Sequence, residues 1–328
     1  MGSSRPIFLL SGAWVLLAGC GLATAQLPDA PAAQSSGQKA TSANPADSPP
    51  TALPQAAPQG SPGQSTPAKE KPIIPAAAER HYRQGALYAR EGDTTDAVAE
   101  YRDAIKEYPD YFEPHYSLGL IYYDKHGYLE AIKEFKEAVR LKPNDADAHN
   151  NLGLALKHNA DLYGAIAEYK EAVRLNPKMA AAQNNLANAL YARKDLTGAI
   201  QHYRAAIELQ PKSAQTRMNL ASALDDAGKS DEAITEYKEA LKLDPRNAKI
   251  HYNLSIVYQK KKDMPTAIAE LKEAARLAPD WPTPHIMLAN LLKDSDPKAA
   301  IDECMLADGL THDAKLHDQC MELQKRVQ

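Results

Sequence analysis

Residues 131–143 read AIKEFKEAVRLKP, and residues 165–177 read AIAEYKEAVRLNP. The two stretches lie 34 residues apart and share alanines at their first and eighth positions, an aromatic ring at the fifth and a proline at the end. The alanines and the proline recur six times along the chain, and the aromatic ring is replaced by Leu271 in the last of them. The repeated prolines are Pro109, Pro143, Pro177, Pro211, Pro245 and Pro279. A fixed period of this length is typical of stacked helix–turn–helix units.

Each unit has the residues that two packed helices need. Ala131 and Ala138 lie seven residues apart, so they share one face of a helix and let a neighbouring helix approach closely, while Phe135 fills the space beside them. Pro143 ends that helix because a residue that precedes proline avoids the helical conformation. One such unit cannot bury its apolar face alone, so neighbouring units must stack.

These motifs resemble the tetratricopeptide repeat (TPR) family over roughly residues 78–315. The resemblance implies an all-α, right-handed α-solenoid of about seven helix–turn–helix repeats over residues 76–315, with a C-terminal capping helix over residues 316–328. Below, a slot is a position in the 34-residue repeat. Slot one of the successive repeats is Ala78, Phe112, Ala146, Ala180, Ala214, Ala248 and Pro282. The seventh repeat is degenerate, since its turn at residues 294–297 has lost one residue.

The N-terminus has the features of a bacterial signal peptide over residues 1–25. Arg5 precedes a short apolar run that ends at Leu17-Ala18-Gly19-Cys20, which resembles a lipobox with Cys20 as the lipidated residue. Ordinary cleavage after Ala25 is the alternative. Either site predicts an extracytoplasmic protein, periplasmic and, with the lipid, anchored to a membrane. Residues 26–75, rich in Pro, Ala, Gln and Ser, are expected to form a disordered linker.

Charge and motif content argue against several classes of function. The chain has 38 basic and 42 acidic residues, a formal net charge of −4, and no basic stripe of the kind that binds nucleic acid. No zinc-ligand, dinucleotide-binding or nucleophile-elbow pattern occurs, so no enzyme activity, cofactor or metal is expected. Slot four holds a column of histidines, for which packing is the main interpretation and a metal or pH role the alternative: His81, His115, His149, His251 and His285.

The cysteines that remain after signal cleavage form one pair. Cys304 lies on the second helix of the last repeat and Cys320 on the final helix, at similar heights on antiparallel neighbours. In an oxidising compartment the two residues are candidates for a disulfide that staples the cap. Two buried, inert thiols are the alternative.

The candidate binding residues form a ladder of asparagines. Slot six of four successive repeats holds Asn151, Asn185, Asn219 and Asn253, and further amides occur at Asn150, Asn184 and Asn188. The stretch Asn150-Asn151-Leu152-Gly153 resembles the repeats of O-linked N-acetylglucosamine transferases, which implies a concave groove whose amides hold a polypeptide backbone. Tyr116, Tyr123, Tyr191 and Tyr252 are expected beside the ladder as interface anchors. The alternative is that these side chains link neighbouring repeats.

These features predict a protein–protein interaction scaffold of the bacterial cell envelope that binds polypeptide partners in its concave groove. A self-associating structural protein is one alternative. A component of a periplasmic metal-dependent or glycosyl-transfer enzyme is another.

Overall fold

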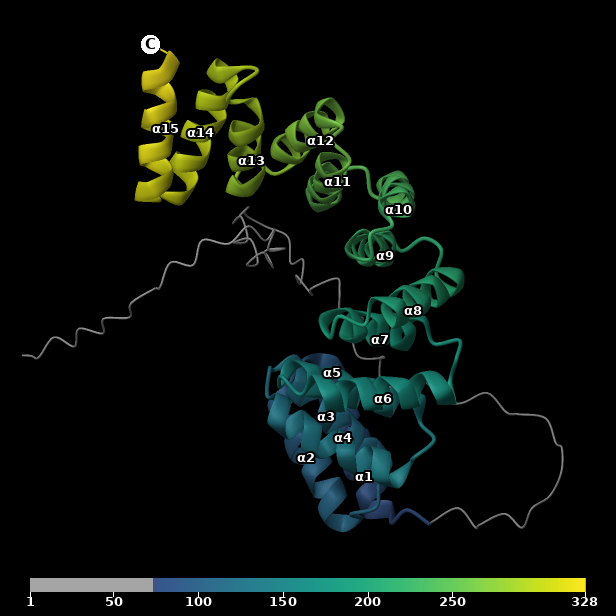
Figure 1. Ribbon diagram of the computed structural model, residues 1–328. Helices are drawn as coiled ribbons and strands as arrows, with labels where there is room; N and C mark the ends of the chain where they lie inside the picture. The colour runs from purple at the N-terminus through teal and green to yellow at the C-terminus, as the bar shows by residue number, and fades with distance from the viewer. Residues whose placement is uncertain (1–72, 328) are drawn as a thin grey trace, which may run out of the picture. The chain divides into compact units, whose positions relative to one another are not determined.

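The computed structural model describes residues 73–327 of the 328-residue chain, and the proposed signal peptide with most of the proposed linker lies outside this range. Within it, the regular elements are all helices, α1 to α15, which follow one another as antiparallel pairs (Figure 1). The first helices of the seven pairs are α1 (Ala76–Glu91), α3 (Phe112–Asp124), α5 (Ala146–His158), α7 (Ala180–Ala192), α9 (Ala214–Asp226), α11 (Ala248–Lys260) and α13 (Pro282–Leu292). Their second helices are α2 (Thr94–Glu107), α4 (Tyr128–Leu141), α6 (Leu162–Leu175), α8 (Leu196–Leu209), α10 (Ser230–Leu243), α12 (Met264–Leu277) and α14 (Pro297–Thr311), and α15 (Ala314–Val327) follows alone. The prediction of an all-α repeat fold is confirmed.

The ends of the helices follow from local sequence signals. The Asp145 side chain accepts a hydrogen bond from the backbone N–H of Ala148 and so caps the start of α5. The second helices end two residues before the repeated proline: α4, for example, ends at Leu141, and Lys142 leaves the helical region with ψ 79° before Pro143. The proline returns with the period of the repeat, so the second helices from α2 to α12 have the same length of 14 residues.

The turn inside each repeat reverses the chain with one left-handed residue. Six turns have this residue at slot fifteen, with φ between 60° and 84°: Gly92, His126, Ala160, Lys194, Gly228 and Lys262. Only two of the six are glycine, the residue that adopts this conformation without steric cost. The repeat geometry therefore imposes the turn even on side chains that disfavour it.

The core lies between the paired helices and continues from pair to pair. Ala131, Phe135 and Ala138 are fully buried, as the repeat motif predicts. Gly119 makes room for Phe135, because a Cβ built on Gly119 would lie 2.5 Å from the ring. Gly153 makes room for Tyr169 in the same way, with a distance of 2.6 Å.

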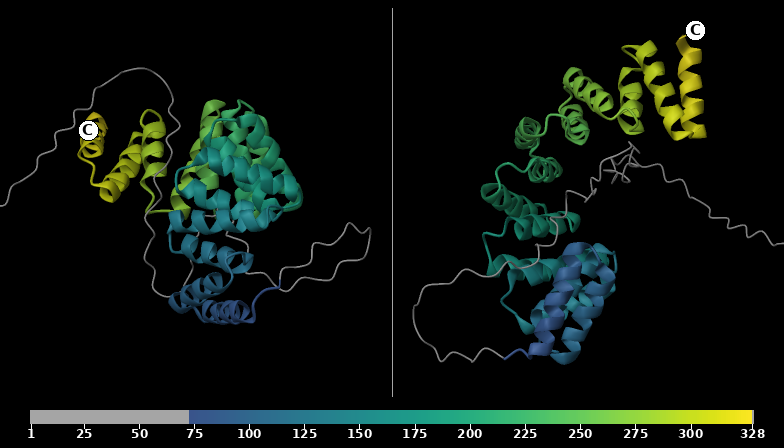
Figure 2. Two further views of the ribbon diagram at one scale, coloured as in Figure 1. Left: turned by 90° about the horizontal axis from the view of Figure 1, so that it is seen from below. Right: turned by 180° about the vertical axis from the view of Figure 1, so that it is seen from behind.

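Each helix pair packs against the next pair along the chain. Each second helix packs on the first helix of the next repeat, and from α3 to α11 the first helices also contact one another directly. The views in Figure 2 show the same succession of pairs from two other sides. The surface carried by helices α3, α5, α7, α9 and α11 is called the first-helix face below. It is the surface on which slots five, six and nine lie.

Candidate functional site

The paired asparagines of the third and fourth repeats lie inside the protein. Asn150, Asn151, Asn184 and Asn185 are at most 6% exposed. The Asn151 amide donates to the Tyr116 hydroxyl at 2.7 Å, and the Asn185 amide donates to the Asn150 oxygen at 3.0 Å. Both hydrogen bonds cross from one repeat to the next. The Oδ1 atom of Asn185 has no hydrogen-bond partner among the described residues.

The asparagines further along the first-helix face are more open. Asn188, Asn219 and Asn253 are partly exposed. The Asn219 amide donates to the Asn188 oxygen at 3.1 Å, again across a repeat boundary, and the Asn188 oxygen also accepts a hydrogen bond from the Tyr203 hydroxyl at 2.7 Å. Slot nine of the next two repeats adds Ser222 and Ile256, which are partly exposed as well. The accessible part of the ladder therefore lies in the fourth to sixth repeats.

The four candidate tyrosines divide in the same way. Tyr116 and Tyr252 are 4% and 9% exposed, and the Tyr252 ring packs against Trp281 with 4.8 Å between ring centroids. Burial raises the pKa of both hydroxyls. Tyr123 and Tyr191 are partly exposed. The Tyr191 hydroxyl donates to the Asp226 carboxylate of the next repeat at 2.6 Å, so the ring is positioned from outside its own helix.

These contacts are the ones expected if the polar residues link neighbouring repeats, the alternative left open by the sequence. At Asn150, Asn151, Asn184 and Asn185, burial closes the amides off from a bound chain. At Asn188, Asn219, Asn253, Tyr123 and Tyr191 the side chains are accessible, and contact with a peptide stays a prediction.

The histidine column, for which the sequence favoured packing and left a metal or pH role as the alternative, forms a repeated set of contacts. In His149, Nδ1 lies 2.6 Å from the Glu168 carboxylate and Nε2 lies 3.0 Å from the Pro143 carbonyl oxygen. His115, His251 and His285 make the same two contacts, with Glu134 and Pro109, with Glu270 and Pro245, and with Glu303 and Pro279. His81 contacts Glu100 at 2.7 Å. We call each two-sided contact a histidine bracket.

A signal for the brackets is present in the sequence. A glutamate follows the histidine by 19 residues in the first, second, third and sixth repeats, and by 18 in the seventh, whose turn is one residue shorter. The histidine and the glutamate recur with the same period as the proline, which indicates that the three residues belong to one structural unit. Only the structure shows that all three members meet.

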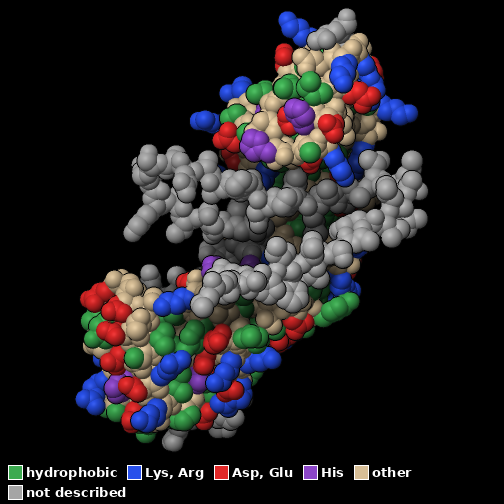
Figure 3. Space-filling model, turned by 90° about the vertical axis from the view of Figure 1, so that its left-hand side faces the viewer, with side chains coloured by type: hydrophobic (Ala, Val, Ile, Leu, Met, Phe, Trp, Pro, Cys, Tyr) green, Lys and Arg blue, Asp and Glu red, His purple; other side chains and the backbone are tan. Residues whose placement is uncertain are grey.

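The charges on the surface are mixed. On the face shown in Figure 3, Lys and Arg side chains alternate with Asp and Glu, without an extended area of one sign. Among residues 73–327, no group of three or more His, Cys, Asp and Glu side chains is arranged to hold a metal ion. No helix of this part of the chain is both long and apolar enough to cross a bilayer.

Family models match most of the repeat region. Models described as TPR repeat match residues 77–126, 127–159 and 223–262, and models described as tetratricopeptide repeat match residues 159–214 and 248–280. Together they span more than half of the chain. The chain belongs to the tetratricopeptide repeat family. Members of this family are typically protein–protein interaction scaffolds and are generally not enzymes.

Solved structures of TPR proteins share the fold. One is YrrB, described as a TPR protein with an unusual peptide-binding site: it has 21% identity and a TM-score of 0.52, and the match covers 59% of this chain and 97% of YrrB. Another is PilF of Pseudomonas aeruginosa, with 20% identity, a TM-score of 0.55, and coverage of 69% and 98%. The C-terminal part of a TPR protein from Cytophaga hutchinsonii has 13% identity, a TM-score of 0.62, and coverage of 72% and 98%. No curated protein matches the chain.

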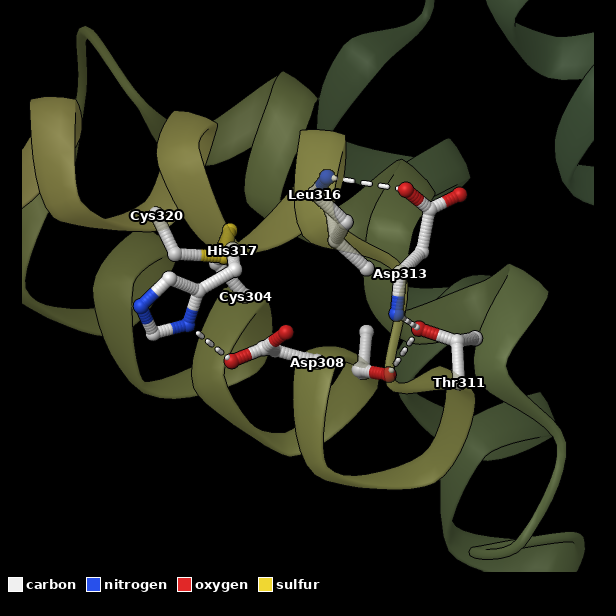
Figure 4. The surroundings of a disulfide bond; sticks show 8 residues. Cys304, Asp308, Thr311, Asp313, Leu316, His317 and Cys320 are labelled. Carbon is white, nitrogen blue, oxygen red and sulfur yellow. Dashed lines mark hydrogen bonds and ion pairs between the residues drawn. A yellow bond between two sulfur atoms is a disulfide. The ribbon is translucent and has the colours of Figure 1, made fainter.

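The last TPR repeat and the final helix are joined covalently. Cys304 of α14 and Cys320 of α15 form a disulfide, with 5.6 Å between their Cα atoms (Figure 4). The Asp308 carboxylate contacts His317 Nδ1 at 2.8 Å beside it, and this contact raises the pKa of His317. Of the two states left open by the sequence, the structure contains the bridge. The helix α15 thus packs on α14 where the first helix of a further repeat would lie.

Proposed function

We propose that this TPR protein is an interaction scaffold that binds a polypeptide partner along its first-helix face, in the fourth to sixth repeats. The observation that carries the proposal is the run of partly exposed side chains at slots six and nine: Asn188, Asn219, Ser222, Asn253 and Ile256. The amide side chains offer both donors and acceptors to a peptide backbone, and Ile256 offers apolar contact. Family membership and the peptide-binding site named for YrrB support the same function.

The proposed site differs from the rest of the first-helix face because its side chains at slot nine are accessible to a partner. In the second and third repeats, slot nine holds Leu120 and Leu154, which are 8% and 1% exposed. Asn150 and Asn151 of the third repeat are buried and form hydrogen bonds with the neighbouring repeats. In the sixth repeat, Lys249 and Lys260 add exposed cations beside the site, and Lys260 is paired with Asp225 of the fifth repeat at 2.6 Å. A partner with both backbone hydrogen-bonding groups and acidic side chains fits this stretch.

Photocrosslinking tests the site. A photoreactive residue placed at Asn219 or Ile256 in the full chain is expected to capture a discrete partner in cells. The matched control is Lys136, an exposed residue on the second helix α4. Equal capture from all three positions would contradict the proposal, since it would mean that the first-helix face has no preference for the partner.

We further propose that the protein works outside the cytoplasm, in a bacterial cell envelope, tethered through a lipid on Cys20. The sequence of residues 1–25 supports this location, and the disulfide between Cys304 and Cys320 fits an oxidising compartment. Cys20→Ser is expected to move the protein from the membrane fraction to the soluble fraction. Mass analysis of the mature chain checks the anchor directly, because an N-terminus at Gln26 would mean that ordinary cleavage is used and no lipid is attached.

A further inference from the structure

In each histidine bracket, two hydrogen-bond acceptors face the two nitrogens of one imidazole ring. In His115, His149, His251 and His285, Nε2 faces a proline carbonyl oxygen, at 3.1, 3.0, 3.3 and 3.2 Å respectively. A carbonyl oxygen only accepts, so Nε2 must carry a hydrogen. Nδ1 of each ring faces a glutamate oxygen at 2.5–2.6 Å. An ionised carboxylate also only accepts.

Both ring nitrogens can donate only when the ring is protonated. A neutral ring that keeps its Nε2 hydrogen for the proline carbonyl turns a lone pair toward the carboxylate, and the short contact becomes repulsive. The brackets therefore hold their full set of hydrogen bonds in the imidazolium form. In agreement, the hydrogen bond that Glu168 accepts raises the pKa of His149, and the hydrogen bond that Glu270 accepts raises the pKa of His251.

Each bracket joins segments from two repeats. The proline carbonyl belongs to the turn that follows the second helix of one repeat, while the histidine and the glutamate belong to the first and second helices of the next. For His149 these are the turn after α4, and then α5 and α6. Loss of the ring proton therefore weakens a connection at a repeat boundary.

Two repeats in the middle make the same connection without a titrating histidine in slot four. Gln183 donates from Nε2 to the Pro177 oxygen at 3.0 Å and accepts from His202 Nδ1 at 2.7 Å. Arg217 donates to the Pro211 oxygen at 3.4 Å and to Glu236 at 2.8 Å. An amide and a guanidinium keep their hydrogens throughout the pH range in which histidine titrates.

We propose that the histidine brackets make the stability of the TPR stack depend on pH at its two flanks, and that the central fourth and fifth repeats do not lose stability in this way as pH rises. The flanks in question are the third repeat, with the His149 bracket, and the sixth repeat, with the His251 bracket. They are held most firmly at mildly acidic pH and loosen as the rings lose their protons. The proposal concerns stability between repeats and does not depend on which partner the first-helix face binds.

The charged groups around the rings agree with this direction. Besides Glu168, His149 is influenced by Glu171, which is itself paired with Arg174. His251 is influenced by Glu273, which is paired with Arg276. His202, in the centre, behaves oppositely, since burial lowers its pKa.

The sign of the effect follows from linkage. A histidine whose pKa is higher in the folded protein than in the unfolded chain contributes stability that is complete below the unfolded value of about 6.5 and is lost as pH rises through the folded value. The folded flanks bind more protons than the unfolded chain. His202, with a lowered pKa, instead favours the folded state more at high pH, so the centre and the flanks respond in opposite directions.

Hydrogen exchange measured on the full chain tests the proposal locally. Protection factors, corrected for the intrinsic dependence of exchange on pH, are compared between about pH 6 and pH 8, a range that spans histidine titration. In α5, α6, α11 and α12 they are expected to fall several-fold as pH rises. In α7 to α10 they are expected to stay constant or to rise. An equal fall in all helices would overturn the proposal.

Variants that carry the slot-four residue of a central repeat separate the effect of ring protonation from the effect of side-chain packing. The double variant His149→Arg with His251→Arg copies Arg217, keeps a permanent cation next to Glu168 and Glu270, and is expected to remove the pH dependence of the flanks. If this variant does not fold, His251→Arg alone is expected to remove it from α11 and α12 only. A wild-type pH dependence in α11 and α12 of either variant would contradict the proposal, as would NMR titration that finds the His149 and His251 rings at their ordinary pKa.

Discussion

The Asn151 amide and the Tyr116 hydroxyl are hydrogen-bonded at 2.7 Å across a repeat boundary, and both side chains are almost completely buried. The bond joins slot six of one repeat to slot five of the preceding one. It shows how a polar residue that could serve a ligand is used instead to fix one repeat on another. Since both side chains are buried, loss of either partner leaves a buried polar group without its bond.

Asn151→Ala is therefore expected to lower the free energy of unfolding by about 1–3 kcal/mol, because the buried tyrosine hydroxyl loses its partner. Tyr116→Phe should cost a similar amount by leaving the asparagine amide unpaired. Urea denaturation of both single variants and the double variant gives the coupling energy. Additive losses would show that the two side chains do not act as a pair.

Asn219→Ala provides a comparison on the exposed part of the ladder. Its bond to Asn188 is partly open to water, so the loss in stability should be smaller than for Asn151→Ala, at about 0.5–1.5 kcal/mol. The affinity for a captured partner is expected to fall by a comparable free energy, if Asn219 contacts the peptide as proposed. An unchanged affinity with a lowered melting temperature would mean that Asn219 only links repeats.

Gly153→Ala is expected to destabilise the protein by about 1–3 kcal/mol through overpacking. The added methyl group would lie 2.6 Å from the Tyr169 ring, which is fully buried and cannot retreat into solvent. Thermal unfolding measures the effect. Gly309→Ala is the matched control, since it adds the same methyl group inside α14 with no atom within 4 Å and should be neutral or stabilising.

Ala160→Gly is expected to stabilise the turn between α5 and α6 by roughly 0.5–2 kcal/mol. Ala160 has φ 63°, a left-handed conformation that costs an L-residue about 1–2 kcal/mol and glycine almost nothing. Part of the gain is cancelled by the greater freedom of glycine in the unfolded chain. Ala205→Gly, inside α8, should instead cost about 1 kcal/mol. Equal effects of the two variants on the urea midpoint would show that the turn carries no strain.

Removal of the disulfide by Cys304→Ser with Cys320→Ser is expected to cost about 3 kcal/mol, the loop-entropy value for a bridge that spans 16 residues. The loss should be local, because α15 contacts the rest of the chain mainly through α14. Hydrogen exchange should therefore rise in α15 and remain unchanged in α3 to α10. Reduction of the wild-type protein should reproduce the same pattern, and a uniform loss of protection would contradict the local role.

The helices themselves could be predicted from the sequence to within a few residues. Six of the seven first helices begin at the predicted residue and α1 begins two residues before it, because the signals are local: alanines seven apart and a proline at a fixed position. The shortened turn near Asp296 was visible as a broken period. The same shortening accounts for the 18-residue spacing between His285 and Glu303.

The contacts of the polar side chains were decided by the tertiary structure. The sequence placed Asn151, Asn185 and Asn219 in the same slot, yet Asn151 and Asn185 are 1% and 2% exposed whereas Asn219 is partly open. Burial at one slot depends on the sizes of the side chains in the adjacent repeats, which a period alone does not specify. In the same way the sequence showed His149 and Glu168 as separate recurring residues. Only the packing of one helix pair on the turn before it brings the imidazole, the carboxylate and the proline carbonyl together, because that contact joins groups from two repeats.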